Sequence, residues 1–228
     1  MAAIKQTAPV PVPVETNDRL LQAAGEVFAE SGFRRATVRE ICARAGANVA
    51  AVNYHFGDKA GLYAAVVKYG VSHALQKYPP DMGLPADGSA TPEQRLRAFV
   101  RSFLFRLLEQ GPYAWHGRVI MWELIEPSGI LGELFPQLIR PLYQRLESIV
   151  RDFLGAAATP ERIRLGCASV LGQCTFYRTA AELLAHVQPG SVNPSTERIE
   201  ALVDHVTRFS AAGLRSYADS APEGAWRP

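Results

Sequence analysis

The side chains best suited to chemistry are concentrated between residues 33 and 59, where basic, amide and very small side chains occur close together. Arginine and lysine bind phosphate oxygens, and the amide of Asn53 carries the donor and acceptor pair that hydrogen-bonds to adenine. Small side chains at Val49 and Ala51 let a helix approach base edges closely. Five basic residues stand in this segment against two acidic ones, namely Arg34, Arg35, Arg39, Arg44 and Lys59. The segment therefore has the composition of a DNA-contacting surface.

Two helices are predicted to precede the residues that would touch DNA. An apolar stripe of helical spacing predicts a first helix over 17–31, and Gly32 stands where that helix should stop. Thr37-Val38-Arg39-Glu40 is a capping-box sequence, in which hydroxyl and carboxylate satisfy free backbone N–H groups. A short second helix is expected to follow, to Ala45.

The third helix is predicted to carry the contacting residues. Gly46 suits a tight turn, Asn48 is a helix-capping residue, and the helix is expected over 49–55. Tyr54 and His55 have the reach to contact phosphate oxygens. Two short helices joined by a glycine-containing turn form a helix-turn-helix, whose second helix enters the major groove.

A fourth helix, 59–77, follows the Gly57-Asp58 break, and then a segment dense in Pro, Gly and Asp marks a boundary. No run of alternating β-branched residues bounded by turns occurs, so the fold is expected to be all-α. Five further helices are predicted, over 92–110, 112–126, 130–154 with bends at Pro136 and Pro141, 160–187, and 194–217. The predicted division is a flexible tail (1–16), a helix-turn-helix domain (17–77), a linker (78–92), an effector-binding and dimerisation domain (93–220) and a C-terminal tail (221–228).

The N-terminal pattern resembles the DNA-binding domain of TetR-family transcriptional regulators from about Arg19 to Lys68. The resemblance is carried by Thr37, by Ile41-Cys42-Ala43-Arg44-Ala45-Gly46, by the run from Asn48 to Lys59, and by Leu62-Tyr63. It implies a homodimer that binds a double-stranded DNA operator. Carried over by position, the DNA-binding residues are Arg39, Asn48, Val49, Ala51, Asn53, Tyr54, His55 and Lys59, of which Val49, Ala51 and Asn53 face bases. Val49 replaces a frequent Lys or Gln, and Asn53 a frequent Tyr, so the operator sequence is left open.

Short motifs further along the chain resemble the C-terminal domain of the CecR subgroup of that family. They are Trp122-Glu123-Leu124-Ile125-Glu126-Pro127, Arg140-Pro141-Leu142-Tyr143 and Leu171-Gly172-Gln173-Cys174. The resemblance implies a ligand-sensing domain that also joins two subunits. The expected function is a repressor that a small-molecule effector releases from a palindromic operator.

Aromatic residues gather between Phe99 and Tyr143, where they either fill a core or line a mostly apolar ligand pocket. Arg118, Glu123, Gln173 and Arg178 are candidate polar groups for such a pocket. An apolar or aromatic effector is expected. The predicted pocket residues are Phe103, Leu107, Trp122, Tyr143, Gln173 and Tyr177.

The three cysteines have no metal-site spacing, so buried, reduced thiols are expected and neither a metal nor a cofactor. Cys42 is expected to pack in the hydrophobic core. Cys167 and Cys174 lie two turns apart in a stretch of small residues, which suits close helix approach in a dimer through 160–187 and 194–217. The alternatives are that these helices only complete the monomer core, or that the two thiols form a redox switch.

Composition separates the remaining function classes. The net charge of +2 divides into +3 for residues 1–77 (9 basic, 6 acidic) and −1 for residues 78–228 (15 basic, 16 acidic). No leader-like or membrane-spanning run is seen, so a cytoplasmic protein without membrane contact is expected. An enzyme is not expected, because nucleophile-elbow, zinc-protease and phosphate-loop motifs are missing. A helical protein–protein adaptor and, less favoured, a small hydrolase are the alternatives.

Overall fold

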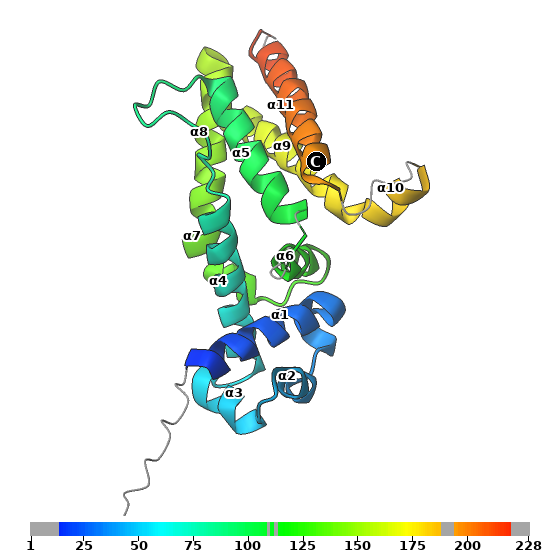
Figure 1. The fold of residues 1–228 in the computed structure, drawn as a ribbon. Coiled ribbons are helices and arrows are strands. Elements are labelled where there is room, and N and C mark those ends of the chain that lie inside the picture. Colours follow the sequence, from blue (N-terminus) through cyan, green and yellow to red (C-terminus); the bar gives the residue numbers. More distant parts are fainter. Residues whose placement is uncertain (1–13, 109, 112–113, 188–193, 220–228) are drawn as a thin grey trace, which may run out of the picture.

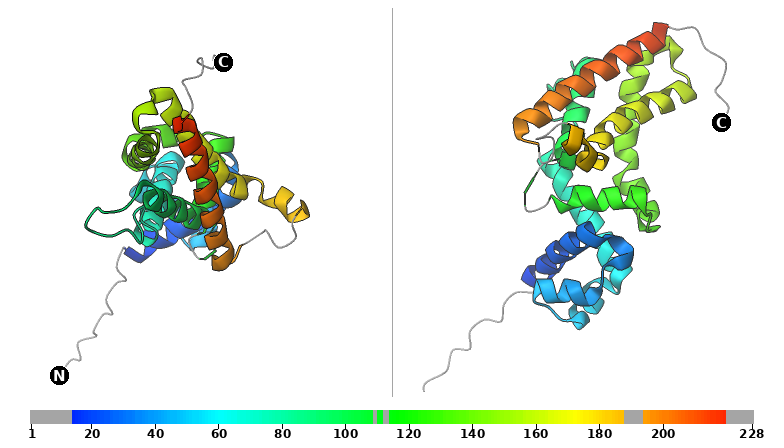
Figure 2. Two further views of the ribbon diagram at one scale, coloured as in Figure 1. Left: turned by 90° about the horizontal axis from the view of Figure 1, so that it is seen from above. Right: turned by 90° about the vertical axis from the view of Figure 1, so that its right-hand side faces the viewer.

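The computed structural model describes residues 14–108, 110–111, 114–187 and 194–219. Their regular structure is helical without a strand, which confirms the all-α expectation. The helices α1 to α3 lie at one end of an elongated molecule and α11 lies at the other (Figure 1), and the second view of Figure 2 shows the same separation. The elements are α1 (Val14–Arg35), α2 (Val38–Ala45), α3 (Val49–Phe56), α4 (Lys59–Lys77), α5 (Pro92–Leu108), α6 (Trp115–Ile125), α7 (Ile130–Leu138), α8 (Arg140–Leu154), η1 (Gly155–Ala157), α9 (Pro160–Thr179), α10 (Ala181–Val187) and α11 (Thr196–Asp219).

The helix-turn-helix forms where the capping signals predict it. The Thr37 hydroxyl accepts the backbone N–H of Glu40 at 3.2 Å, and the Asn48 side chain accepts that of Ala51 at 2.8 Å. Between the two helices, Gly46 adopts the left-handed conformation with φ 62° and ψ 39°. Each helix therefore starts directly after a side-chain cap, because the cap satisfies a backbone N–H that the helix itself leaves unbonded.

The first helix is longer than the sequence predicts. It begins at Val14, so the expected tail of 1–16 is too long, and residues 1–13 lie outside the described part of the chain. Gly32, with φ 74° and ψ 171°, interrupts the helix at the expected place, and one further turn continues to Arg35. A Cβ on Gly32 would lie 3.2 Å from the indole of Trp122, so this interruption also lets α6 pack closely.

The next two helices follow their caps. The Asp58 carboxylate accepts the N–H of Gly61 at 2.8 Å and starts α4. At the start of α5, Thr91 and Gln94 exchange two hydrogen bonds of 2.8 and 3.2 Å, which completes a capping box. α5 ends at Leu108, two residues before the predicted end at Gln110.

Two helices that were expected to be continuous are interrupted. The predicted bent helix 130–154 is two helices, separated at Ile139, because Pro141 lacks the N–H that would continue the hydrogen-bond ladder. The predicted helix 160–187 breaks at Ala180. The hydroxyls of Thr175 and Thr179 bond back to the carbonyls of the preceding turn at 2.9 and 3.1 Å, which favours bending there.

The last helix starts later than predicted. α11 begins at Thr196, where the Ser195 hydroxyl accepts the N–H of Arg198 at 3.3 Å. The expected start of a helix at residue 112 and the tail 221–228 lie outside the described residues.

The hydrophobic cores do not follow the predicted domain boundary. One core contains α1 to α4, but it also includes Trp115 and Val119 of α6 and Leu134 of α7. The other core is built from α5, α6, α8, α9 and α11. In this core, α1 therefore packs directly on α6, and α4 packs on both α6 and α7.

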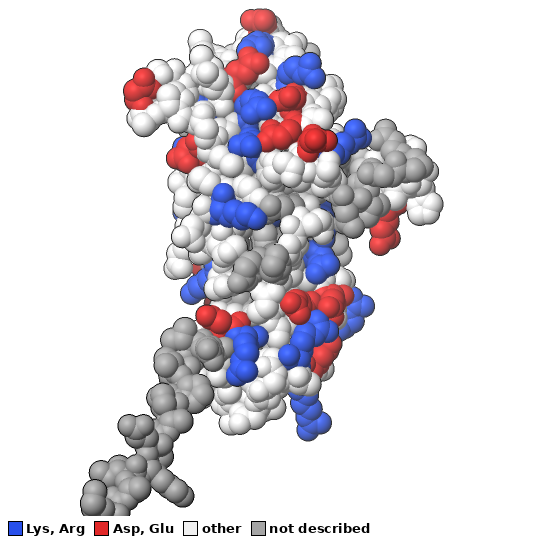
Figure 3. All heavy atoms as spheres, viewed as in Figure 1, with Lys and Arg blue, Asp and Glu red and all other residues white. Residues whose placement is uncertain are grey.

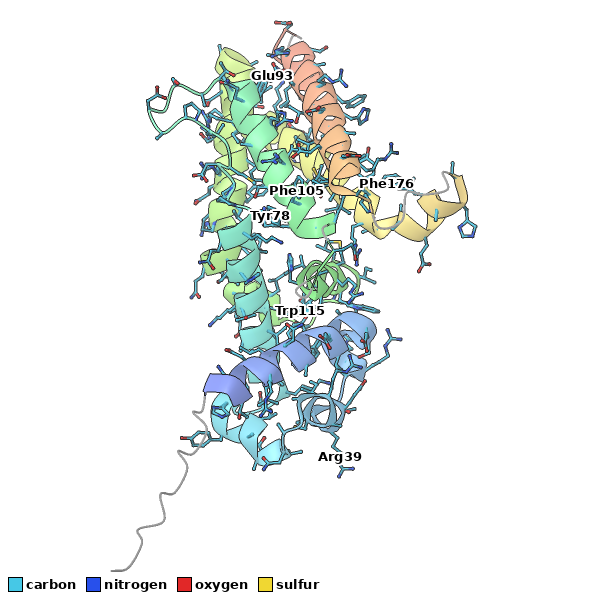
Figure 4. All side chains as sticks on the ribbon, viewed as in Figure 1. Arg39, Tyr78, Glu93, Phe105, Trp115 and Phe176 are labelled. Atoms are coloured by element: carbon cyan, nitrogen blue, oxygen red, sulfur yellow. The ribbon has the colours of Figure 1, made fainter. Side chains whose placement is uncertain are left out.

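Trp115 is the largest side chain at this junction and is 2% exposed. Its indole N–H donates to the Gln22 side chain of α1 at 3.0 Å. A Cβ on Gly25 of α1 would lie 2.4 Å from the ring, and a Cβ on Gly70 of α4 would lie 3.0 Å from it. Two glycines thus make the space in which Trp115 sits between α1 and α4, and Figure 4 shows it where α6 meets α1.

Candidate nucleic-acid interface and cavity

The outer face of α3 is a surface of small and hydrogen-bonding side chains. Val52 is its only fully buried residue and holds the helix on the core. Val49 is 43% and Tyr54 is 85% exposed, and Asn53 is exposed beside them. An 85% exposed tyrosine side chain makes little contribution to the fold, so its position is compatible with contacting another molecule. The face presents methyl groups, an amide and a phenol, which are groups that read bases or bind phosphate.

The remaining predicted DNA-binding residues border this face. His55 is exposed, and its ring makes an edge contact with that of Tyr54 at 5.0 Å. Ala51 is half-buried, so it is less accessible than Val49. The oxygen of Asn48 is used in the helix cap, which leaves its NH₂ group as the end directed to a ligand.

Most basic side chains of this segment are held in contacts within the protein. Arg44 donates two hydrogen bonds to Glu30 at 2.7 and 2.8 Å, and Arg34 pairs with Glu126 at 3.5 Å. The Arg35 guanidinium stacks on an α6 indole at 5.2 Å from the ring centroid. Figure 3 shows positive and negative groups side by side at this end of the molecule. These three arginines therefore brace α1, α2 and α6, and that the local charge excess faces DNA stays a prediction.

Arg39 and Lys59 differ in whether their charged groups have partners within the protein. Arg39 is exposed, makes no hydrogen bond or ion pair with the described residues, and points away from the body in Figure 4. The Lys59 ammonium donates to the Arg34 carbonyl at 3.1 Å and lies 4.8 Å from the Phe33 ring, and partial burial lowers its pKa. Arg39 is thus free to bind phosphate, whereas Lys59 also fastens α4 to the end of α1.

This difference gives a prediction for salt dependence. Arg39→Ala is expected to reduce the slope of log affinity against log salt by about 0.9, because one phosphate contact and its released counterion are lost. Anisotropy titrations of a labelled duplex at several salt concentrations measure the slope. Arg44→Ala is the matched control on the same helix and should leave the slope unchanged. Equal slopes for Arg39→Ala and the wild type would contradict the contact.

A cavity of about 410 Å³ lies between α4 and the helices α5 to α9. Its lining is almost wholly apolar, and it contains three of the six predicted pocket residues, namely Phe103, Leu107 and Tyr143. Leu124 and Phe135 also line it and are 61% and 43% exposed, which places them at its mouth. The volume is within the range of small-molecule sites.

The other predicted pocket residues lie elsewhere. The Trp122 indole N–H donates to the Ala29 carbonyl at 3.0 Å, so this ring joins α6 to α1. Gln173 donates to the Ser210 hydroxyl at 3.0 Å, and Tyr177 lines a shallow hollow between α9 and α11. These three residues are of types that often line pockets. Their positions around the helix place them on faces of α6 and α9 that point away from the cavity.

The candidate polar groups are also displaced from the cavity. Glu123 is buried against the Tyr63 hydroxyl, while Arg118 is exposed and Arg178 half-buried outside the lining. The lining instead contains Arg106 and His116, which the sequence analysis did not select. A sequence signal exists for Arg106, since it is a single charge within Phe103-Leu104-Phe105-Arg106-Leu107-Leu108.

The cysteines are buried and unpaired. Burial raises the pKa of Cys167 to about 11 and that of Cys174 to about 12, so both are neutral thiols at pH 7. Both lie inside the core of the body, and a Cβ on Gly166 would lie 2.8 Å from Val150. The cysteine face of α9 therefore lies in the monomer core, and that helices 160–187 and 194–217 meet a second subunit stays a prediction.

The exposed helix α3, held by α2 and α4 at one end of a helical body that contains an apolar cavity, is typical of helix-turn-helix regulatory proteins. Residues 20–66 match the family model "Bacterial regulatory proteins, tetR family", and residues 92–214 match "HTH-type transcriptional dual regulator CecR, C-terminal domain". The chain belongs to the TetR family of bacterial transcriptional regulators, and its second domain is of the CecR type.

Individual relatives agree with this placement. The dual regulator CecR of Shigella flexneri is 28% identical over 177 residues, which cover 75% of this chain and 78% of that protein. The fatty acid degradation regulator FadR of Bacillus halodurans shares the fold with a TM-score of 0.63 at 19% identity, over 91% of this chain and 99% of that one. PfmR of Thermus thermophilus, a TetR-family regulator, gives 0.61 at 18% identity, over 86% and 99%. Within the described residues, no helix has the length and apolar character needed to cross a bilayer.

Proposed function

We propose that this regulator is a repressor that binds a palindromic operator as a homodimer and is released by a small-molecule effector. The observation that carries the proposal is the double contact of α6. One face of α6 lines the cavity through Gly117, Ile120, Met121 and Leu124. The other face holds α1 through the indole N–H groups of Trp115 and Trp122.

This arrangement couples the cavity to the helices α1 to α3, which we call the reading head. A ligand that fits the cavity better in one arrangement of α6 shifts the population toward it, by its difference in affinity for the two states. α4 acts in the same way, since Val71 and Ala74 line the cavity while its first residue, Lys59, contacts α1. Displacement of α1 and α4 changes the position of α3, and with it the affinity for DNA.

Dimerisation is supported by the outer face of α9 and α11. Phe176 and Phe209 are 49% and 64% exposed, and Gly172 and Gly213 have no neighbouring atom at the Cβ position. α10 extends away from the other helices in Figure 1 and exposes Leu183 and Val187. A second copy of the chain would bury these apolar side chains, and glycines allow close approach of its helices.

A dimer of this kind would present two copies of α3 to successive major grooves, about 34 Å apart. The test measures binding to duplexes that cover the DNA flanking the gene. Any site that the protein protects in footprinting is then compared with a duplex that contains only one half of it. A palindromic site is expected to bind at least ten times more tightly than its half-site. Specific binding to none of these duplexes would contradict the proposal.

Asn53 is the residue expected to read sequence. Asn53→Ala should weaken binding to the preferred site by about 1–3 kcal/mol and leave nonspecific affinity nearly unchanged, because an amide-to-base contact is lost. Competition titrations with preferred and scrambled duplexes measure both quantities. Tyr54→Phe serves as the control for a backbone contact and should weaken both duplexes alike. An equal loss of affinity for both duplexes in Asn53→Ala would show that Asn53 contacts the DNA backbone instead of a base.

A further inference from the structure

Arg106 is the unusual side chain of the cavity. It lies on the α5 stripe that also carries Phe99 and Phe103, and it lines the cavity with them. Its Nε donates to the carbonyl and hydroxyl oxygens of Ser102, both at 3.2 Å. Its Nη2 is buried and has no hydrogen-bond partner among the described residues. One end of the guanidinium is thus anchored on Ser102, and the other has an unused donor among the described residues.

The charge on Arg106 is not compensated within the cavity. No aspartate or glutamate occurs among the described lining residues. The acids of the adjacent helices α6 and α11 have other partners: Glu123 accepts from the Tyr63 hydroxyl, and Glu200 accepts from Arg101 at 2.5 Å. Burial lowers the pKa of Arg106 to about 10, which still leaves it charged at neutral pH. A cation with a buried donor that lacks a partner is costly, and an anion placed beside the guanidinium recovers part of that cost.

We propose that the effector is a monoanionic amphiphile, with a carboxylate that binds the Arg106 guanidinium and an apolar body that fills the rest of the cavity. The inference deepens the ligand-responsive function proposed above and rests on it for the regulatory consequence. A carboxylate matches the planar donors of a guanidinium better than a neutral group does. The body must be apolar, because Phe99, Phe103 and Ile120 surround the remaining space.

The entrance geometry fits an elongated ligand. Leu124 and Phe135 are at the exposed mouth, while Phe99 and Met121 are buried at 2% and 7% exposure. Arg106 lines the cavity beside buried Phe99 on α5, so we place the anion at this wall and the apolar body toward the mouth. Water is excluded from the ion pair in this arrangement, which strengthens it.

The test compares ligands that differ only in charge. Calorimetry with the purified full-length protein uses decanoate against 1-decanol, and 2-naphthoate against 2-naphthol, below micelle-forming concentrations. Wild type is expected to prefer each acid over its alcohol about tenfold or more. Tighter binding of decanoate would indicate an aliphatic body for the effector, and tighter binding of 2-naphthoate an aromatic one. Equal binding of acid and alcohol in both pairs, or binding of neither acid, would overturn the proposal without requiring any variant to fold.

Variants locate the charge. Arg106→Met keeps the unbranched stem, and its preference for the acid should fall below twofold, while Arg106→Lys should retain part of it. Arg118→Met removes an exposed arginine of α6 outside the lining and should bind like wild type. An acid preference that persists in Arg106→Met would contradict the assignment of the anion to Arg106.

Operator binding, measured on the same samples, separates this inference from the regulatory function. If the unliganded protein binds operator DNA and no acid binds, the anion site is wrong and the DNA-binding function stands. If an acid binds through Arg106 but operator affinity is unchanged, the site stands and the proposed coupling is wrong. Binding of the acid together with at least tenfold weaker operator affinity supports both.

Discussion

Replacing Trp115 with alanine is expected to lower the free energy of unfolding by about 3–5 kcal/mol, as for other large buried aromatics. The ring is 2% exposed and its N–H bonds to Gln22, so the change leaves both a cavity and a lost hydrogen bond. Urea unfolding followed by circular dichroism measures the effect. Because Trp115 joins the reading head to the body, the loss should appear in the unfolding of both parts.

Gly25→Ala provides a sharp control, because its effect should change sign with the tryptophan. In the wild type the added Cβ would lie 2.4 Å from the indole and destabilise the protein. In Trp115→Ala that obstacle is gone, and alanine is favoured over glycine within a helix by about 1 kcal/mol. The same destabilisation in both backgrounds would show that the ring does not occupy this space.

Replacing Glu123 with alanine is expected to lower the free energy of unfolding by about 2–4 kcal/mol. Glu123 is 5% exposed, and its two carboxylate oxygens accept from the Tyr63 hydroxyl at 2.6 Å and from the Ser128 N–H at 3.2 Å. Alanine leaves both donors without their partner at the junction of α4, α6 and the turn before α7. Burial is the main cause that raises the pKa of Tyr63, so its hydroxyl stays protonated and continues to need an acceptor.

A double-mutant cycle with Tyr63→Phe isolates this bond, and the two changes should couple by about 1–3 kcal/mol. Glu126→Ala is the matched control, since Glu126 is three residues further on and pairs with exposed Arg34 at 3.5 Å. It should cost at most about 1 kcal/mol, as surface ion pairs do. Additive losses for Tyr63→Phe and Glu123→Ala would mean that the hydrogen bond contributes nothing to stability.

The helix-turn-helix could be predicted closely because its signals are local. A cap such as Thr37 or Asn48 bonds to a backbone N–H three residues further on. Gly46 can adopt the left-handed conformation because it has no Cβ. Longer helices were predicted less well. The breaks at Ile139 and Ala180 occur where the helical pattern of apolar residues continues, so periodicity alone does not show them.

The candidate sites show the same limit. Exposure of Val49, Asn53 and Tyr54 follows from the helical period of α3, since its core face is formed by Val52 with Phe56 and Ala51. Composition left a packed core and an apolar pocket open for the body. Its predicted pocket residues include Trp122, whose ring contacts α1, but not Arg106, which lines the cavity. Residue type indicates what a side chain can do, whereas its neighbours decide what it does.

The sequence alone determined the all-helical class, the reading head and the resemblance that places the chain among TetR-family regulators, because caps, turns and helical periods depend on residues a few positions apart. Only the tertiary structure decided which arginines are free, that Trp115 occupies a space made by Gly25 and Gly70, and that α6 serves both the cavity and α1. Such contacts join distant residues, as between Trp115 and Gln22, 93 positions apart. Their contacts depend on how whole helices pack, and packing is set by the sum of many weak interactions rather than by any local signal.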